Sequence, residues 1–326
     1  MSHRLVALMG SLRHTLTLLV LLGVAALARP TWGVFGVVVV ALALNLAAAL
    51  VVHPLLRRQL PLLVSHLALL ALVAIVGVGK LVKLDGRFEL LQGEPFDGRL
   101  LDHAAGAWAD VDLARLALRN EGFTIDYAPG HRRGATRNAV AWRDEHGNEQ
   151  RAVIGDHRPL VVGATRLYTS PNKGFAPLLR WQPARGEPVR GAVHLPSYPM
   201  HALRQSREWT LPDGRAVWLM LQLPDEPLIA RDAPAQFRLP GVHRLVVRVG
   251  DARHELAPGD AMPLDGGVLF YEGLRPWMGY RVSHDPTLPW LLAAALTASL
   301  ALALHYAIVF IAPRPQGVPA TRASHA

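Results

Sequence analysis

The chain has no cysteine among its 326 residues. This absence excludes disulfides, thiolate metal sites, thioether attachment of a group to the chain itself and any thiol–disulfide relay that the chain would run. Any redox step in which the protein takes part must therefore be performed by a partner.

Lysine is almost absent as well. It occurs only at positions 80, 83 and 173, so arginine supplies nearly all of a formal net charge of +9. The longest basic runs are Arg57-Arg58 and Arg132-Arg133, and neither is accompanied by interleaved aromatic residues or a glycine-rich phosphate loop. The basic charge therefore does not predict a nucleic-acid partner.

Charged residues are scarce in four long stretches. Hydrophobic residues make up 51% of the chain and charged residues 18%, and the apolar excess lies in four runs, at 15–28, 33–52, 60–79 and 288–312. A helix needs about twenty apolar residues to cross a bilayer core. The sequence therefore predicts a membrane protein with four transmembrane helices: an N-terminal membrane domain (1–80) with three spans, and a last span at 288–312 followed by a tail (313–326).

The basic residues near the spans predict their orientation. Arg4 and Arg13 precede the first run, Arg57-Arg58 separates the second from the third, and two further arginines, Arg314 and Arg322, follow the fourth. All fall on one side of the membrane, so both termini are expected in the cytoplasm and 81–287 outside. The residues around 26–28 also resemble a signal-peptidase site, so cleavage of the first span is an alternative to an uncleaved helix.

Between the third and fourth spans, 81–287 has the pattern of an antiparallel β-rich domain, either sandwich-like or barrel-like. Only 104–120 shows helical periodicity, and 144–148 predicts a hairpin turn. His194 and His201 are close in sequence but are interpreted as surface residues. The domain shows no metal-ligand spacing and no catalytic motif. The strand candidates are 123–127, 139–143, 150–154, 160–169, 216–223, 242–249 and 267–271.

Three polar residues lie within the spans. Asn45, His66 and His305 are each six or seven residues from the cytoplasmic end of a run, or about 9–11 Å inside it. They are interpreted either as hydrogen-bonding groups that hold the helices together or as a layer in which a histidine binds a metal. Neutral imidazole is the usual protein ligand of haem iron, and helical geometry alone leaves both interpretations open.

This arrangement resembles the ResB (CcsB) family of the system II cytochrome c maturation pathway. The resemblance is carried by Asn45-Leu46, the basic turn Arg57-Arg58 and Ser65-His66-Leu67. It extends to residues 154–160, to residues 166–170, and to Asp285-Pro286 before the last span. The family's cysteines have no counterpart in this chain, so direct thiol chemistry is excluded.

The resemblance implies a noncatalytic subunit of a haem export and cytochrome c synthetase complex in the bacterial cytoplasmic membrane. It implies a tryptophan-rich CcsA/ResC-like membrane partner, apocytochrome c as a second partner, and haem as a transported or transiently bound group. His66 corresponds to the family's haem-ligating histidine, whereas His305 matches no family motif. A membrane-anchored ligand sensor and a structural assembly factor that does not contact haem remain alternatives.

Overall fold

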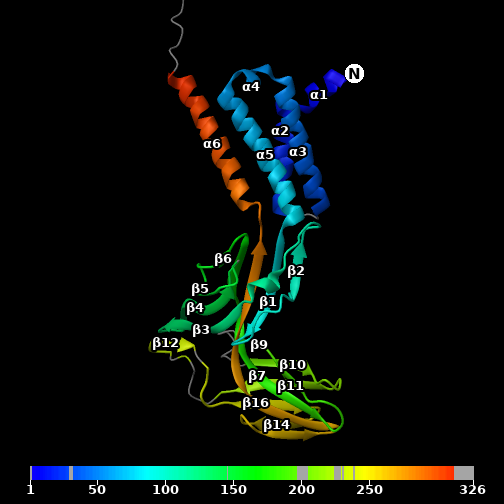
Figure 1. Cartoon of the computed structure of the whole chain (residues 1–326), viewed down its shortest axis with the longest axis vertical. Coiled ribbons are helices and arrows are strands. Elements are labelled where there is room, and N and C mark those ends of the chain that lie inside the picture. The colour runs from blue at the N-terminus through cyan, green and yellow to red at the C-terminus, as the bar shows by residue number, and fades with distance from the viewer. Residues whose placement is uncertain are drawn as a thin grey trace, which may run out of the picture. The chain divides into compact units, whose positions relative to one another are not determined.

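The computed structural model describes residues 2–28, 32–144, 146–196, 205–223, 229, 231–237 and 239–311. It divides the chain into two compact units, one formed by Met1–Val82 with Pro286–Ala326 and the other by Lys83–Asp285 (Figure 1). The predicted tail, with Arg314 and Arg322, lies outside the described residues, as does His201.

The described part of the first unit consists of helices and the short connections between them. Three of its helices, α3, α5 and α6, have the length and the apolar composition to cross a membrane. α2 is also apolar but has 17 residues, fewer than the about twenty that span a bilayer core, so the fourth predicted span stays a prediction. The helices are α1 Ser2–Met9, α2 Leu12–Ala28, α3 Trp32–Val52, α4 Pro54–Arg58, α5 Leu60–Val82 and α6 Leu288–Ile311.

The second unit is β-rich, and all its strand pairs are antiparallel. The strands are β1 Leu84–Leu91, β2 Asp102–Ala105, β3 Arg119–Ala128, β4 Arg132–Arg143, β5 Glu149–Gly155, β6 Leu160–Val162, β7 Thr165–Pro183, β8 Val189–Ala192, β9 Leu195–Pro196, β10 Gln205–Thr210, β11 Ala216–Gln222, β12 Ala235–Phe237, β13 Arg244–Val249, β14 Ala252–Leu256, β15 Ala261–Leu264 and β16 Gly267–His284. This confirms the predicted antiparallel β-rich domain.

The strands form three sheets. The largest, which we call sheet A, has the order β2-β1-β16-β7-β6, with β8 and β9 paired to β7 and β15 paired to β16. Sheet B has the order β12-β3-β4-β5 and sheet C the order β10-β11-β13-β14. The long strands β7 and β16 run side by side through the unit, so sheet A is built around one ladder (Figure 1).

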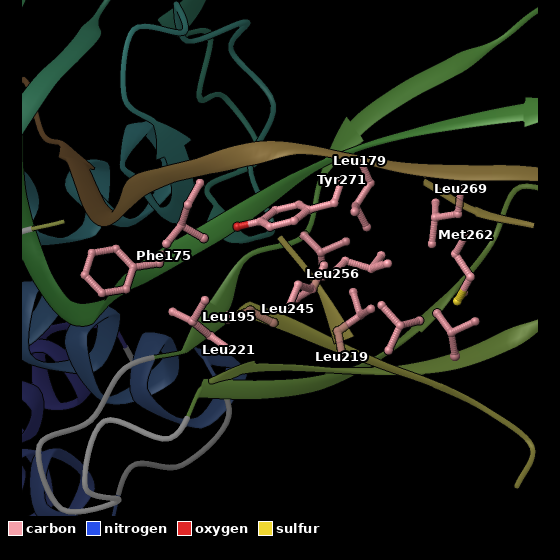
Figure 2. Packing of buried hydrophobic residues seen from close by; sticks show 14 of the residues in the cluster. Phe175, Leu179, Leu195, Leu219, Leu221, Leu245, Leu256, Met262, Leu269 and Tyr271 are labelled. Atoms are coloured by element: carbon pink, nitrogen blue, oxygen red, sulfur yellow. The ribbon is translucent and has the colours of Figure 1, made fainter. Parts of the chain in front are cut away.

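This ladder contributes to two hydrophobic cores. In the first, Leu269 and Tyr271 of β16 pack with Phe175 and Leu179 of β7 against leucines of sheet C (Figure 2). In the second, residues from the other end of the ladder pack against β1, sheet B and the segment before β3. β16 has two register shifts against β7, one at Tyr271/Gly273 in the part that packs in the first core and one at Met278/Tyr280 in the part that packs in the second. A β-bulge locally bends and twists a strand. Such bends are consistent with β7 and β16 packing in one core along part of their length and in the other core along the rest.

The structure corrects two local predictions and confirms a third. The predicted helix at 104–120 is wrong, because this stretch ends β2, turns, and forms only the short 3-10 helix η1 (Leu113–Leu116). The predicted strand at 160–169 is two strands, since Gly163 turns the chain with φ 55° between β6 and β7. The predicted hairpin is confirmed by the pairing of β4 with β5.

Candidate functional site

Asn45 of α3 joins three helices and is 1% exposed. The hydroxyl of Thr15 in α2 donates a 2.8 Å hydrogen bond to its Oδ1, and its Nδ2 donates to the carbonyl oxygen of Met9 in α1. Both ends of the amide are therefore engaged. α1 also comes close to α3 at Gly10, where a Cβ would lie 2.8 Å from the amide nitrogen of Ala49, so glycine permits this approach.

His66 lies on α5 and is half-buried. Its Nδ1 is 2.9 Å from the carbonyl oxygen of Leu62, one turn earlier. A carbonyl oxygen only accepts, so Nδ1 carries a proton and donates, and in the neutral ring the lone pair is then on Nε2. The described residues provide no hydrogen-bond partner for Nε2. This is the tautomer that a histidine needs to bind a metal through Nε2.

The neighbouring residue, Ser65, faces α6. Its hydroxyl donates to the carbonyl oxygen of Ala298 at 3.3 Å, and the contact is lined by the small buried residues Ala68 and Ala301. Small residues let membrane helices approach closely, and side-chain hydrogen bonds add to the association. α5, the helix that carries His66, therefore packs on α6 through small residues.

His305 lies on α6 and is half-buried. Its ring meets the ring of Tyr306 edge to face at a centroid distance of 5.4 Å. Among the described residues, no hydrogen bond joins Asn45, His66 and His305 to one another. Each meets a different neighbour: Asn45 contacts α1 and α2, His66 its own helix, and His305 the adjacent tyrosine.

The β-rich unit holds a cavity of about 670 Å³. Its lining includes Tyr168, Thr169 and Ser170, which belong to the segment 166–170 singled out from the sequence. Two of its acidic lining residues, Asp102 and Asp156, form ion pairs with arginines. Asp102 is held by Arg87, and burial works to raise the pKa of Asp156 but the amide of Thr136 and the guanidinium of Arg133 bring it below its usual value. Because both carboxylates are ionised and paired with arginines, they are suited to binding a polar ligand rather than to accepting a proton.

At one side of this cavity, Glu89 of β1 reaches across the neighbouring strand β16. Its Oε1 accepts a 2.7 Å hydrogen bond from Asn172 Nδ2, and its Oε2 lies 2.7 Å from His194 Nδ1. Glu89 pairs in register with Gly279. A Cβ at Gly279 would lie 2.5 Å from Ser170 Oγ and 2.7 Å from the Asn172 carbonyl oxygen. Glycine at this position of β16 therefore allows side chains of β1 and β7 to meet the side chain of His194, which lies between β8 and β9.

His194 is accordingly not the surface residue expected from the sequence. Its ring stacks on Trp277 at 4.8 Å with an interplanar angle of 7°, and its side chain is 21% exposed. Trp277 is 1% exposed, and its Nε1 donates to the carbonyl oxygens of Phe175 and Leu195. No sequence signal predicted this arrangement, since Glu89 and His194 are far apart in the chain and neither lies in a motif.

A second polar cluster surrounds Lys173, which is 4% exposed. Its Nζ lies 3.4 Å from Thr136 Oγ1, which also accepts a 2.5 Å hydrogen bond from Arg133. Burial, together with the charge of Arg133, lowers the pKa of Lys173 to about 8. The described residues include no group of three or more His, Asp or Glu side chains that could hold a metal ion.

No family model matches the chain, and no curated protein matches it. Among solved structures, the chain is similar to a "Cytochrome c Heme Lyase CcmF", with 14% sequence identity and a TM-score of 0.26. The match covers 91% of this chain and 37% of that chain, so this chain spans well under half of the length of that protein. At this identity and TM-score the likeness establishes neither a common fold nor a common activity.

Proposed function

We propose that the chain is a ResB-like, noncatalytic subunit of a system II complex that exports haem and attaches it to apocytochrome c. The proposal is supported by the sequence resemblance around Asn45, Arg57-Arg58 and His66, and by apolar helices joined to a β-rich unit. Haem is the cargo in this proposal and not a resident cofactor. The β-rich unit then lies on the outer side of the cytoplasmic membrane and both termini lie inside.

The observation that carries the proposal is the contact of His66 Nδ1 with the carbonyl oxygen of Leu62. Because Nδ1 donates to the Leu62 carbonyl at 2.9 Å, the ring is held by its own helix and Nε2 presents a lone pair. Neutral imidazole nitrogen is a common axial ligand of haem iron. Asn45 has both polar ends occupied, so it acts on the positions of the helices, whereas His66 is the candidate ligand.

The β-rich unit supplies the outer docking surface in this proposal. Haem joins apocytochrome c through the cysteines of a Cys-x-x-Cys-His motif, and this chain has no thiol that could compete for them. The matched charges around the cavity at Arg87, Asp102 and Asp156 favour recognition over catalysis. Catalysis of attachment, and the tryptophan-rich segment that presents haem, would come from a CcsA/ResC-like subunit.

The decisive experiment is a haem absorption spectrum of the chain purified with its partner. We expect His66→Ala to reduce haem content several-fold or to shift the Soret band. Added imidazole should restore the wild-type spectrum, because it can fill the vacated ligand position. The matched control is His305→Ala, which removes an intramembrane histidine of similar exposure and should leave the spectrum unchanged.

An unchanged spectrum and haem content in His66→Ala would exclude the ligand role. If that variant also matured cytochrome c normally while deletion of the chain did not, the chain would be an assembly factor that does not contact haem. The side of the membrane is checked separately. A single cysteine placed at Val242, which is 75% exposed, should react with an impermeant maleimide added to intact spheroplasts.

A further inference from the structure

The tight turn that follows β2 carries an exposed tryptophan. The amide of Ala109 donates to the carbonyl oxygen of Gly106 at 3.0 Å, which closes a turn with Trp108 at its third position. Trp108 is 67% exposed. The chain is anchored just after it, because Ala109 and Val111 pack against the second core of the β-rich unit. The indole is therefore held outward by a fixed piece of backbone.

This turn is tied to the residue that follows a membrane helix. The amide of Gly106 donates a 2.8 Å hydrogen bond to the carbonyl oxygen of Lys83, and α5 ends at the preceding residue, Val82. α5 has 23 residues, so it is about 34 Å long, compared with about 30 Å for the hydrocarbon core of a bilayer. Its last turn therefore reaches the headgroup layer, and the turn with Trp108 is hydrogen-bonded to the residue that directly follows this helix in the chain, Lys83.

The residues around this point are those found at membrane–water interfaces. Two of the three lysines of the chain, Lys80 and Lys83, lie at the end of α5. Lysine is common near the ends of spanning helices, and here the ammonium group of Lys83 forms an ion pair with Asp85. Trp290, in the first turn of α6, is 68% exposed. The β-rich unit connects α5 to α6, so Trp290 belongs to the same leaflet.

Tryptophan is enriched at this depth because its ring is apolar and its N–H still reaches water or a headgroup. In water, a 67% exposed indole on a rigid turn leaves a large apolar surface uncovered. We propose that Trp108 inserts into the headgroup layer of the leaflet that faces the β-rich unit, and that the turn at 106–109 is a lipid-binding anchor. The partner is the phospholipid surface itself. This requires that α5 crosses the membrane and that the β-rich unit turns the segment 106–109 toward the leaflet, and it is independent of haem handling.

The absence of cysteine makes the test direct, since a single introduced cysteine can be spin-labelled without background. The label is placed at Ala107, which is exposed and leaves Trp108 intact, in the full chain reconstituted into phosphatidylcholine–phosphatidylglycerol vesicles. Collision of the nitroxide with oxygen and with a water-soluble nickel chelate then reports its depth. The control is the label at Val242, which is 75% exposed and precedes His243, whose ring is hydrogen-bonded to the hydroxyl of Tyr271 in β16.

We expect the label at Ala107 to be several-fold less accessible to the nickel chelate than the label at Val242. Combining it with Trp108→Ser should raise its nickel accessibility toward that of the control, because serine gains nothing from the headgroup layer. Equal nickel accessibility at the two sites would overturn the proposal. So would a low accessibility at Ala107 that Trp108→Ser leaves unchanged, because the shielding would then come from protein. Circular dichroism confirms that each labelled chain is folded.

Discussion

The hydroxyl of Tyr280 in β16 donates a 2.7 Å hydrogen bond to Asn138 Oδ1 in β4. Tyr280 is 1% exposed and Asn138 0% exposed. Asn138 Nδ2 in turn donates to Asn120 Oδ1 at 2.8 Å, and Asn120 Nδ2 donates to the carbonyl oxygen of Leu90. This chain of buried hydrogen bonds connects sheet A with sheet B. Burial raises the pKa of Tyr280, so the hydroxyl remains a donor throughout the accessible pH range.

The first prediction follows from this connection. Tyr280→Phe keeps the ring but leaves Asn138 Oδ1 buried without its donor, which costs about 1–3 kcal/mol of unfolding free energy. The measurement is denaturant unfolding of the full chain in detergent, followed by near-ultraviolet circular dichroism. The control is Tyr306→Phe, on α6 and 52% exposed, which should have little effect. Equal midpoints for Tyr280→Phe and wild type would show that the buried network does not stabilise the fold.

The second prediction concerns the meeting of Glu89 with Asn172 and His194. Gly279→Ala introduces a Cβ that would lie 2.5 Å from Ser170 Oγ and 2.7 Å from a backbone oxygen. The backbone cannot move away without disturbing the ladder of β16 and β7. We therefore expect the substitution to lower the unfolding free energy by about 1–3 kcal/mol. Gly191→Ala is the matched control. It lies in β8, and a Cβ there meets nothing within 4 Å.

The outcome is read from unfolding midpoints and from the fluorescence of Trp277, on which His194 stacks. Trp277 contributes to a signal from 8 tryptophans, so the spectra are compared as differences between variant and control. If Gly279→Ala had the same unfolding midpoint and fluorescence as Gly191→Ala, the position opposite Glu89 on β16 would not require glycine.

The third prediction concerns Lys173, whose pKa is lowered by burial to about 8, compared with an ordinary 10.5. Between these two values the unfolded chain binds the proton more tightly than the folded one. The unfolding free energy should therefore rise as the pH increases through this window, by up to about 3 kcal/mol. Lys173→Met keeps the apolar stem and removes the charge, so this rise should disappear.

Lys83→Met is the control for this measurement, because Lys83 forms an ion pair with Asp85 and its side chain is 34% exposed. It should retain the pH dependence of the wild type. A wild-type stability that stays constant or falls as the pH rises above about 8 would show that Lys173 is not held in the low-dielectric environment that its burial indicates.

Hydropathy predicted the helices well, because long apolar runs at 33–52, 60–79 and 288–312 have few structural alternatives. The helix predicted at 104–120 was wrong for a physical reason. Ala109, Val111 and Leu113 recur at every second position because an extended segment packs on the second core, whereas Leu113 and Leu116 of the 3-10 helix lie three residues apart, a spacing that an α-helix shares. Single-sequence periodicity does not distinguish these cases.

The candidate sites also differ in how far the sequence alone predicts them. His66 and Asn45 could be selected from the sequence because a polar residue in an apolar run is conspicuous. The contact of Glu89 with His194 could not, since it depends on strand register and on a glycine between them, which arise only when distant strands pair. Lys173 could be selected as a rare residue type, but its burial was visible only in the folded ladder.

The pairing of β1 with β16 determines when the β-rich unit can be completed during synthesis. Leu84 lies opposite His284, so the first strand of the unit pairs with the last, and β16 is also the central partner of β7. Neither β1 nor β7 gains that neighbour until nearly all of the unit has left the ribosome. Closing so long a loop is slow, and unpaired strand edges remain open to wrong partners meanwhile. Truncations that end before β16 are therefore expected to leave an unfinished sheet instead of a smaller domain.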